Sequence, residues 1–136
     1  MILCSGAFDG LHSGHVAYLE AAKALDPTQT LIVAVAPDAY IRQAKHREPR
    51  WSQVQRARVV RALQVVDTVA LQAEPSLAMT IRAYRPQMVV KGLDWVQTIP
   101  ADVAQACVEV GATLAFTDTD ETHTRQVDWT AIGAGL

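Results

Sequence analysis

Short apolar runs alternate along the chain with longer stretches in which apolar positions recur at helical spacing. The runs are continuously apolar, which is typical of strands that are covered on both faces. They predict five strands, at 1–5, 31–36, 68–71, 88–90 and 113–116.

The stretches between these runs predict helices, because their apolar positions repeat with a period near 3.6 residues. Ser52 provides an N-cap for one of them, Pro27 follows the end of another, and Gly111 closes a third. The predicted helices cover 15–25, 52–63, 76–84 and 100–110, and a last one starts near Thr122.

The regular alternation of strands and helices predicts an α/β fold, built as a single domain over residues 1–136. We expect a Rossmann-like five-stranded parallel sheet with helices on both faces, joined by right-handed crossovers. Ligands of such sheets bind beyond the carboxyl ends of the strands, so the residues that follow each strand are the functional candidates.

Composition narrows the class of protein. Half of the 136 residues are hydrophobic, and 12 Lys and Arg against 14 Asp and Glu give a net charge of −2, which disfavours a dedicated nucleic-acid or membrane-surface binder. Cys4 and Cys107 lie in separate apolar runs without Cys-x-x-Cys spacing, so neither a disulfide scaffold nor a structural zinc site is expected. No apolar run approaches the ~18 residues of a membrane span, and no signal-peptide pattern is present, which predicts a cytoplasmic protein.

The residues that follow the first predicted strand carry the strongest chemical signal. They form a glycine-rich turn, Gly6-Ala7-Phe8-Asp9-Gly10-Leu11-His12-Ser13-Gly14-His15, that leads into a helix. Free backbone N–H groups and the helix dipole favour an anion there, and Gly14 leaves room for a phosphate. His12 and His15 are three residues apart and can face the same side, where imidazoles stabilise charge in phosphoryl transfer. The plainer interpretation is one histidine capping the turn and one on the surface.

Basic residues are concentrated in one segment of this slightly acidic chain. Between positions 42 and 61, only Glu48 opposes them. A focused positive field suits phosphorylated substrates, whereas the alternative is a solvated basic helix face. An RNA-binding patch is disfavoured because Trp51 is the one aromatic residue in the segment. The residues are Arg42, Lys45, Arg47, Arg50, Arg56, Arg58 and Arg61.

The turn after the first strand resembles the signature of the cytidylyltransferase-like nucleotidyltransferases, Gly-x-Phe-Asp-x-x-His-x-Gly-His. Residues 14–35 resemble the domain that makes ADP-heptose and also glycerol-3-phosphate cytidylyltransferase. The segments 55–67 and 90–95 are similar to further segments of both, so the resemblance runs from Leu3 to about Arg125.

This resemblance implies a role for individual residues. His12, His15 and Lys45 would be catalytic, with the histidines contacting the phosphates of a nucleoside triphosphate. Arg56, together with Lys45, would bind the phosphate of the acceptor. The implied nucleotide-binding residues are Gly6, Ala7, Phe8, Asp9, Gly14, Gly92, Asp94, Thr122 and Thr124.

The chain departs from the family pattern near its C-terminal end. Thr117 stands where the family usually has an arginine, and Asp118, Asp120 and Glu121 bring negative charge toward the expected phosphate site. These acids either cap the last helix and complement its dipole or help to hold Mg²⁺ through waters.

The function expected from the resemblance is transfer of CMP or AMP from CTP or ATP to a phosphorylated sugar or polyol, with release of pyrophosphate. Mg²⁺ is the expected cofactor and a homodimer the expected assembly, with no nucleic acid or membrane partner. The base and the acceptor stay open. One alternative is a nucleotide-binding regulatory module of the same fold without turnover. A flavodoxin-like receiver domain is disfavoured, because it needs an acidic cluster where only Asp9 is present.

Overall fold

The computed structural model describes residues 1–117. The strands are β1 (Ile2–Gly6), β2 (Leu31–Val35), β3 (Thr68–Leu71), β4 (Met88–Gly92) and β5 (Thr113–Thr117). The helices are α1 (Ser13–Leu25), α2 (Asp38–Lys45), α3 (Gln53–Arg61), α4 (Ala78–Tyr84) and α5 (Ala101–Val110), with a short 3₁₀ helix, η1 (Leu93–Trp95). The helix predicted from Thr122 lies outside the described residues.

All strand pairs are parallel and the five strands follow the order β3-β2-β1-β4-β5, which confirms the predicted Rossmann-like sheet. The chain first winds outward from β1 to β3 and then returns to place β4 on the other side of β1. The strand order therefore reverses between β1 and β4, and α/β sheets bind their ligands in the crevice at such a reversal.

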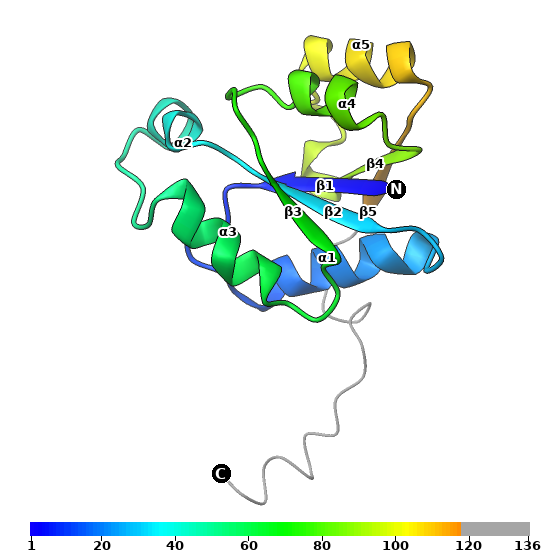
Figure 1. The fold of residues 1–136 in the computed structure, drawn as a ribbon. Coiled ribbons are helices and arrows are strands. Elements are labelled where there is room, and N and C mark those ends of the chain that lie inside the picture. The colour runs from blue at the N-terminus through cyan, green and yellow to red at the C-terminus, as the bar shows by residue number, and fades with distance from the viewer. Residues whose placement is uncertain (118–136) are drawn as a thin grey trace, which may run out of the picture.

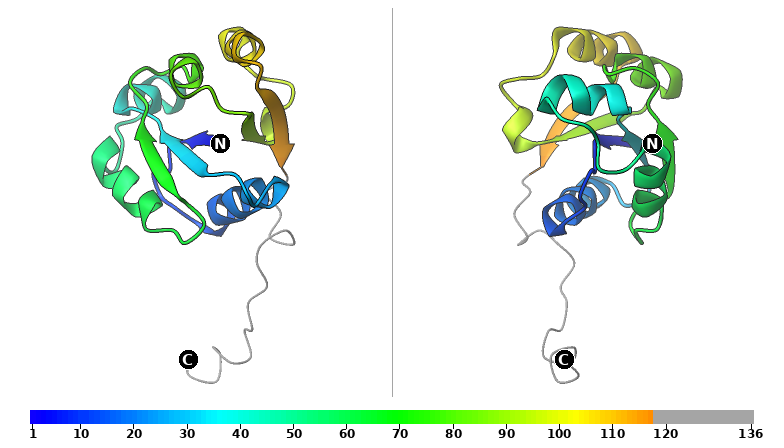
Figure 2. Two further views of the ribbon diagram at one scale, coloured as in Figure 1. Left: turned by 45° about the vertical axis from the view of Figure 1, so that its right-hand side comes forward. Right: turned by 90° about the vertical axis from the view of Figure 1, so that its left-hand side faces the viewer.

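Two apolar cores, one on each face of the sheet, hold the layers together. Helices α1 and α3 cover one face, and α4 and α5 cover the other (Figure 1). Ile2 and Cys4 of β1 point into the core under α1 and α3, whereas Leu3 between them belongs to the core under α4 and α5. Successive side chains of a strand point to opposite faces, so a continuously apolar run supplies both cores. Figure 2 shows the two helix layers from further directions.

Helix α2 and η1 were not predicted from the sequence. Ile41 is the one buried residue of α2, and a single apolar position gives no helical period. None of the residues of η1 is buried. The two cysteines are buried and unpaired, as their apolar surroundings predicted. Within residues 1–117, no helix has the length and apolar character that crossing a membrane requires.

Tyr18 of α1 separates β1 from β4 near their carboxyl ends. The pairing of the two strands stops after Cys4 and Val90. The buried Tyr18 hydroxyl then stands between them: it donates to the Val90 carbonyl and accepts from the Ser5 N–H at 3.3 Å. A side chain thus replaces the next ladder contact, and the crevice between the strands opens where the sheet order reverses.

Candidate active site

A cavity of about 630 Å³ lies at the carboxyl ends of the strands. Its walls come from the β1–α1 turn, the ends of β2, β3 and β4, and the first residues of α5. Nine of the predicted site residues line it, so the fold brings most of the expected site together. They are Gly6, Ala7, Phe8, His12, Gly14, His15, Lys45, Gly92 and Asp94.

Phe8 shapes the β1–α1 turn. Its backbone has a left-handed φ of 53°, and its ring is 5% exposed. The ring folds back over Gly6, where a Cβ atom would lie 2.9 Å from Phe8 Cζ. Glycine is therefore required at position 6 so that the phenyl ring can pack against the backbone of the turn.

The two histidines form a capping box at the start of α1. His12 is the N-cap residue, and its Nδ1 accepts from the Gly14 N–H at 3.1 Å. His15 is the N3 residue, and its Nδ1 accepts from the His12 N–H at 3.2 Å. The spacing of three between the histidines is that of a reciprocal cap, in which each end satisfies a free backbone N–H group of the helix terminus.

This cap determines which ring nitrogen of each histidine can donate. Because each Nδ1 accepts a backbone hydrogen bond, the neutral ring carries its proton on Nε2. The ring centroids are 3.9 Å apart, so two Nε2–H donors stand side by side at the cavity wall. The prediction that both imidazoles face the same side is confirmed.

His15 is uncharged at neutral pH. Burial, followed by the positive charges of His12 and Lys45, lowers the pKa of His15 to about 4. Its imidazole therefore meets an anion as a hydrogen-bond donor, and the approach of negative charge would make the imidazolium easier to form.

The structure gives a steric reason for glycine at position 14. A Cβ atom at this position would lie 2.9 Å from His12 Cε1 and 3.0 Å from Nδ1. The absence of a side chain at Gly14 thus leaves room for the His12 ring in its cap, and the expectation that it also leaves room for a phosphate stays a prediction.

The Asp9 side chain contacts other residues of the protein and does not line the cavity. Its side chain is 1% exposed and pairs with Arg47 at 2.7 Å. It also accepts from the backbone N–H groups of Arg50 and Trp51. Burial raises the pKa of Asp9, but these hydrogen bonds outweigh it and hold the pKa below its usual range. Asp9 is not among the residues that line the cavity; it anchors the loop 47–51 against the β1–α1 turn.

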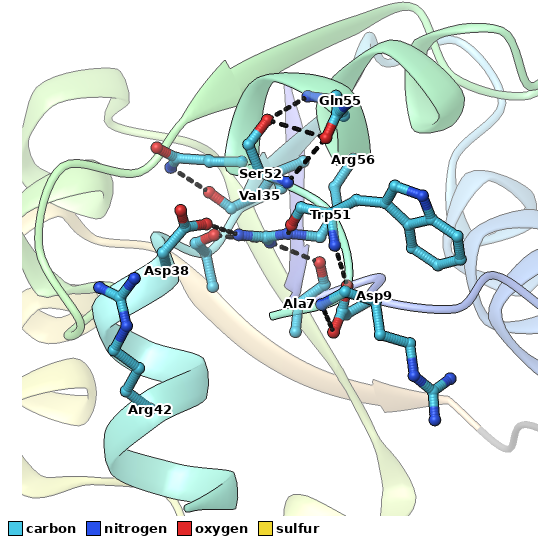
Figure 3. A network of polar contacts seen from close by, with 12 residues as sticks. Ala7, Asp9, Val35, Asp38, Arg42, Trp51, Ser52, Gln55 and Arg56 are labelled. Atoms are coloured by element: carbon cyan, nitrogen blue, oxygen red, sulfur yellow. Dashed lines mark hydrogen bonds and ion pairs between the residues drawn. The ribbon is translucent and has the colours of Figure 1, made fainter. Parts of the chain in front are cut away.

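Arg56 is also turned inward, although the family resemblance implied that it contacts the acceptor phosphate (Figure 3). The residue is 2% exposed. Its guanidinium donates to the carbonyls of Ala7 at 2.7 Å and Ala36 at 2.8 Å, to that of Trp51 at 3.0 Å, and to Asp38 Oδ1 at 2.7 Å. The geometry thus places Arg56 beneath the cavity, where it joins the turns that follow β1 and β2 to the start of α3.

Three of the seven basic residues of the segment form ion pairs within the protein. Arg42 pairs with Glu48, Arg47 with Asp9, and Arg56 with Asp38. Only Glu48 was expected to oppose these residues, because Asp9 and Asp38 lie outside positions 42–61. Lys45 is the member of the segment that lines the cavity.

Lys91 at the end of β4 is a cavity residue to which the sequence analysis gave no role. Its Nζ donates to Ser5 Oγ at 2.8 Å, across the crevice that Tyr18 opens, and lies 4.7 Å from the centroid of the Trp95 ring. Desolvation lowers the pKa of Lys91 to about 8, although Cys4 and Asp94 act in the opposite direction. The available signal was its position directly after a predicted strand.

The described residues offer few ligands for a metal ion. They contain no group of three or more His, Cys, Asp or Glu side chains that could hold one. Asp94 and Asp102 line the cavity, and such a pair fits Mg²⁺ only if phosphate oxygens of a substrate supply most of the ligands. Thr122 and Thr124, like the acids at 118, 120 and 121, lie outside the described residues.

A parallel sheet with a glycine-rich turn and a helix N-terminus at its reversal point is typical of nucleotide-binding α/β proteins. The comparison with protein families is more specific. The model described as cytidylyltransferase-like matches residues 3–127, and the chain belongs to this family.

Individual relatives agree with this assignment. The chain is 39% identical over 94 residues to the FAD synthase of Methanopyrus kandleri, covering 68% of the chain and 62% of that protein. It is 40% identical over 96 residues to the bifunctional protein HldE of Coxiella burnetii, covering 70% of the chain and 20% of that protein. The chain thus spans less than two thirds of the length of either relative.

A solved structure has the same fold. The lipopolysaccharide core biosynthesis protein from Thermoplasma volcanium superposes with a TM-score of 0.70 at 26% identity. The match covers 86% of this chain and 94% of that one.

Proposed function

We propose that the chain is a nucleotidyltransferase that moves CMP or AMP from CTP or ATP to a phosphorylated sugar or polyol. Membership of the cytidylyltransferase-like family supports the reaction class. The observation that carries the proposal is the histidine capping box, which aims two Nε2–H donors at a cavity beside a helix N-terminus.

The reaction requires no covalent enzyme intermediate. An oxygen of the acceptor phosphate attacks the α-phosphorus of the nucleoside triphosphate, a new P–O–P bond forms, and the bond to the β-phosphate oxygen breaks to release pyrophosphate. Both reactants arrive as phosphates, so catalysis consists of positioning and of stabilising the charge on the α-phosphoryl oxygens.

The residues divide this work between them. His12 and His15 donate to the phosphoryl oxygens, and Lys45 supplies a positive charge at the same end of the cavity. Gly92 at the end of β4 and Asp94 in η1 provide the wall for the base and ribose. Phe8, Asp9 and Arg56 keep the turn in place from below, which preserves the alignment that the attack requires.

Mg²⁺ is the proposed cofactor. It would neutralise charge on the triphosphate when bound, and Asp94 or Asp102 could contribute a carboxylate oxygen or hold a coordinated water. A homodimer, suggested by the family resemblance, also stays a proposal.

The decisive experiment measures pyrophosphate release. The protein is mixed with Mg²⁺, each of CTP, ATP, GTP and UTP, and a panel of acceptors: sugar 1-phosphates, glycerol 3-phosphate and, prompted by the FAD synthase relative, flavin mononucleotide. We expect release with one triphosphate and one acceptor class, dependent on both. Thermal stabilisation by a triphosphate without any turnover would instead favour a regulatory nucleotide-binding module.

A further inference from the structure

Lys91 is a cation without a carboxylate at ion-pair distance among residues 1–117. Its Nζ donates to the neutral Ser5 hydroxyl, and one side of the ammonium is covered by the Trp95 ring. A partly buried ammonium is costly unless an anion or several acceptors satisfy it. Since Lys91 lines the cavity, an anion that enters the cavity can reach it.

The cavity has cationic side chains in two places. Lys45 lines it together with the two histidines of the β1–α1 turn, and its charge acts on His15. Lys91 lines it at the β1/β4 crevice, where its Nζ contacts Ser5 Oγ. An anion at the turn and a second anion at the crevice would therefore meet different cations.

We propose that Lys91 binds the phosphate group of the acceptor substrate. This inference rests on the proposed function, in which two phosphorylated molecules meet in one cavity. The triphosphate has its place at the histidine turn. The acceptor phosphate must approach the α-phosphorus from the side opposite the leaving pyrophosphate, which a separate cation across the crevice allows.

The wall beyond Lys91 is suited to a hydroxylated acceptor. Ser76 at the start of α4 donates to the Asp102 carboxylate at the start of α5, and both residues line the cavity. This contact joins the two loops and presents oxygen atoms that can accept hydrogen bonds from hydroxyl groups. A sugar or polyol phosphate can therefore place its phosphate on Lys91 and its hydroxyls along this wall.

The first test is a binding experiment that needs no turnover. Inorganic phosphate is titrated into the protein while the indole N–H resonance of Trp95, assigned with Trp95→Phe, is followed by NMR. We expect a saturable shift in the parent and in Lys91→Arg, and at least a ~10-fold weaker response in Lys91→Met, in line with loss of a charge-assisted hydrogen bond. Lys45→Met, which removes the cation at the other end, should keep the Trp95 response.

The second test is kinetic. Lys91→Met should raise KM for the acceptor by at least ~10-fold while KM for the triphosphate changes less than ~2-fold. The pH profile adds a readout that a structural role would not move: with the pKa of free Lys91 at about 8, acceptor affinity should fall above that pH as the ammonium loses its proton. Lys91→Arg stays charged and should remove this decline.

The outcomes separate the two proposals. An unchanged Trp95 response in Lys91→Met, or a rise in KM confined to the triphosphate, would overturn the assignment of Lys91. If no acceptor supports turnover while phosphate still shifts Trp95 through Lys91, the anion site stands and the proposed reaction fails.

Discussion

Two basic side chains at the carboxyl edge of the sheet, Arg56 and Lys91, have opposite environments. Arg56 has three backbone carbonyls and the Asp38 carboxylate as partners, all from the protein itself. Lys91 has one neutral hydroxyl and the face of an aromatic ring. This difference indicates that a buried cation supports the structure when groups of the protein fill its hydrogen-bonding positions. A buried cation with few such partners is a candidate for substrate binding.

The largest expected effect is a difference in the free energy of unfolding between variants of these two cations. Arg56→Met leaves three carbonyls and Asp38 without their donor, so we expect a loss of about 3 kcal/mol in the free energy of unfolding. Lys91→Met removes a poorly satisfied charge and should change stability by less than about 1 kcal/mol. Urea unfolding of both variants beside the parent measures the contrast, and equal losses would contradict the division between a structural and a substrate-facing cation.

His15→Ala tests the catalytic role of the histidine turn. The substitution removes one of the two Nε2–H donors, and we expect turnover to fall at least ~100-fold, as for loss of one transition-state donor. Part of the capping box is also lost, which should cost about 1 kcal/mol of stability. Steady-state pyrophosphate release with the folded variant tests this, and turnover at the parent's rate would remove His15 from the site.

Gly14→Ala should have a smaller effect on the same cap. The new Cβ atom would meet the His12 ring at 2.9 Å, so the ring must leave its hydrogen bond with the Gly14 N–H. We expect a ~10-fold loss of kcat, corresponding to about 1.4 kcal/mol of misplaced transition-state contact, with the fold retained. Gly111→Ala is the matched control, because a Cβ atom at this position meets nothing within 4 Å. The φ of 72° at Gly111 makes the substitution strained. Circular dichroism and kinetics therefore distinguish the two variants.

The sheet and four of the five described helices were predictable, because continuous apolar runs and a 3.6 period are properties of neighbouring residues. The glycine-rich turn was predictable for the same reason. The inward orientation of Asp9 and Arg56 was not. The partners of Asp9 lie 38 to 42 residues away, and those of Arg56 include Asp38 at 18 residues and Ala7 at 49 residues. Pairing across such distances leaves no local pattern.

The environment of Lys91 was also not predictable from the sequence. Its chemistry depends on Ser5, which lies 86 residues earlier in the chain, and on the Tyr18 hydroxyl that separates β1 from β4. Neither contact follows from the residues around position 91. The steric need for glycine at position 14 was not predictable either, because the ring that a Cβ atom would meet belongs to a histidine whose cap geometry the sequence does not specify.

The most direct test of the account measures the pKa of His15 by NMR, from the Hε1 resonance, with and without CTP or ATP and Mg²⁺. Free His15 should titrate near pH 4, and a triphosphate held at the capping box should raise that value by at least ~1 unit, because a nearby negative charge stabilises the imidazolium. Saturating binding of the triphosphate with no change in the pKa of His15 would contradict the claim that the histidine turn is the phosphate site.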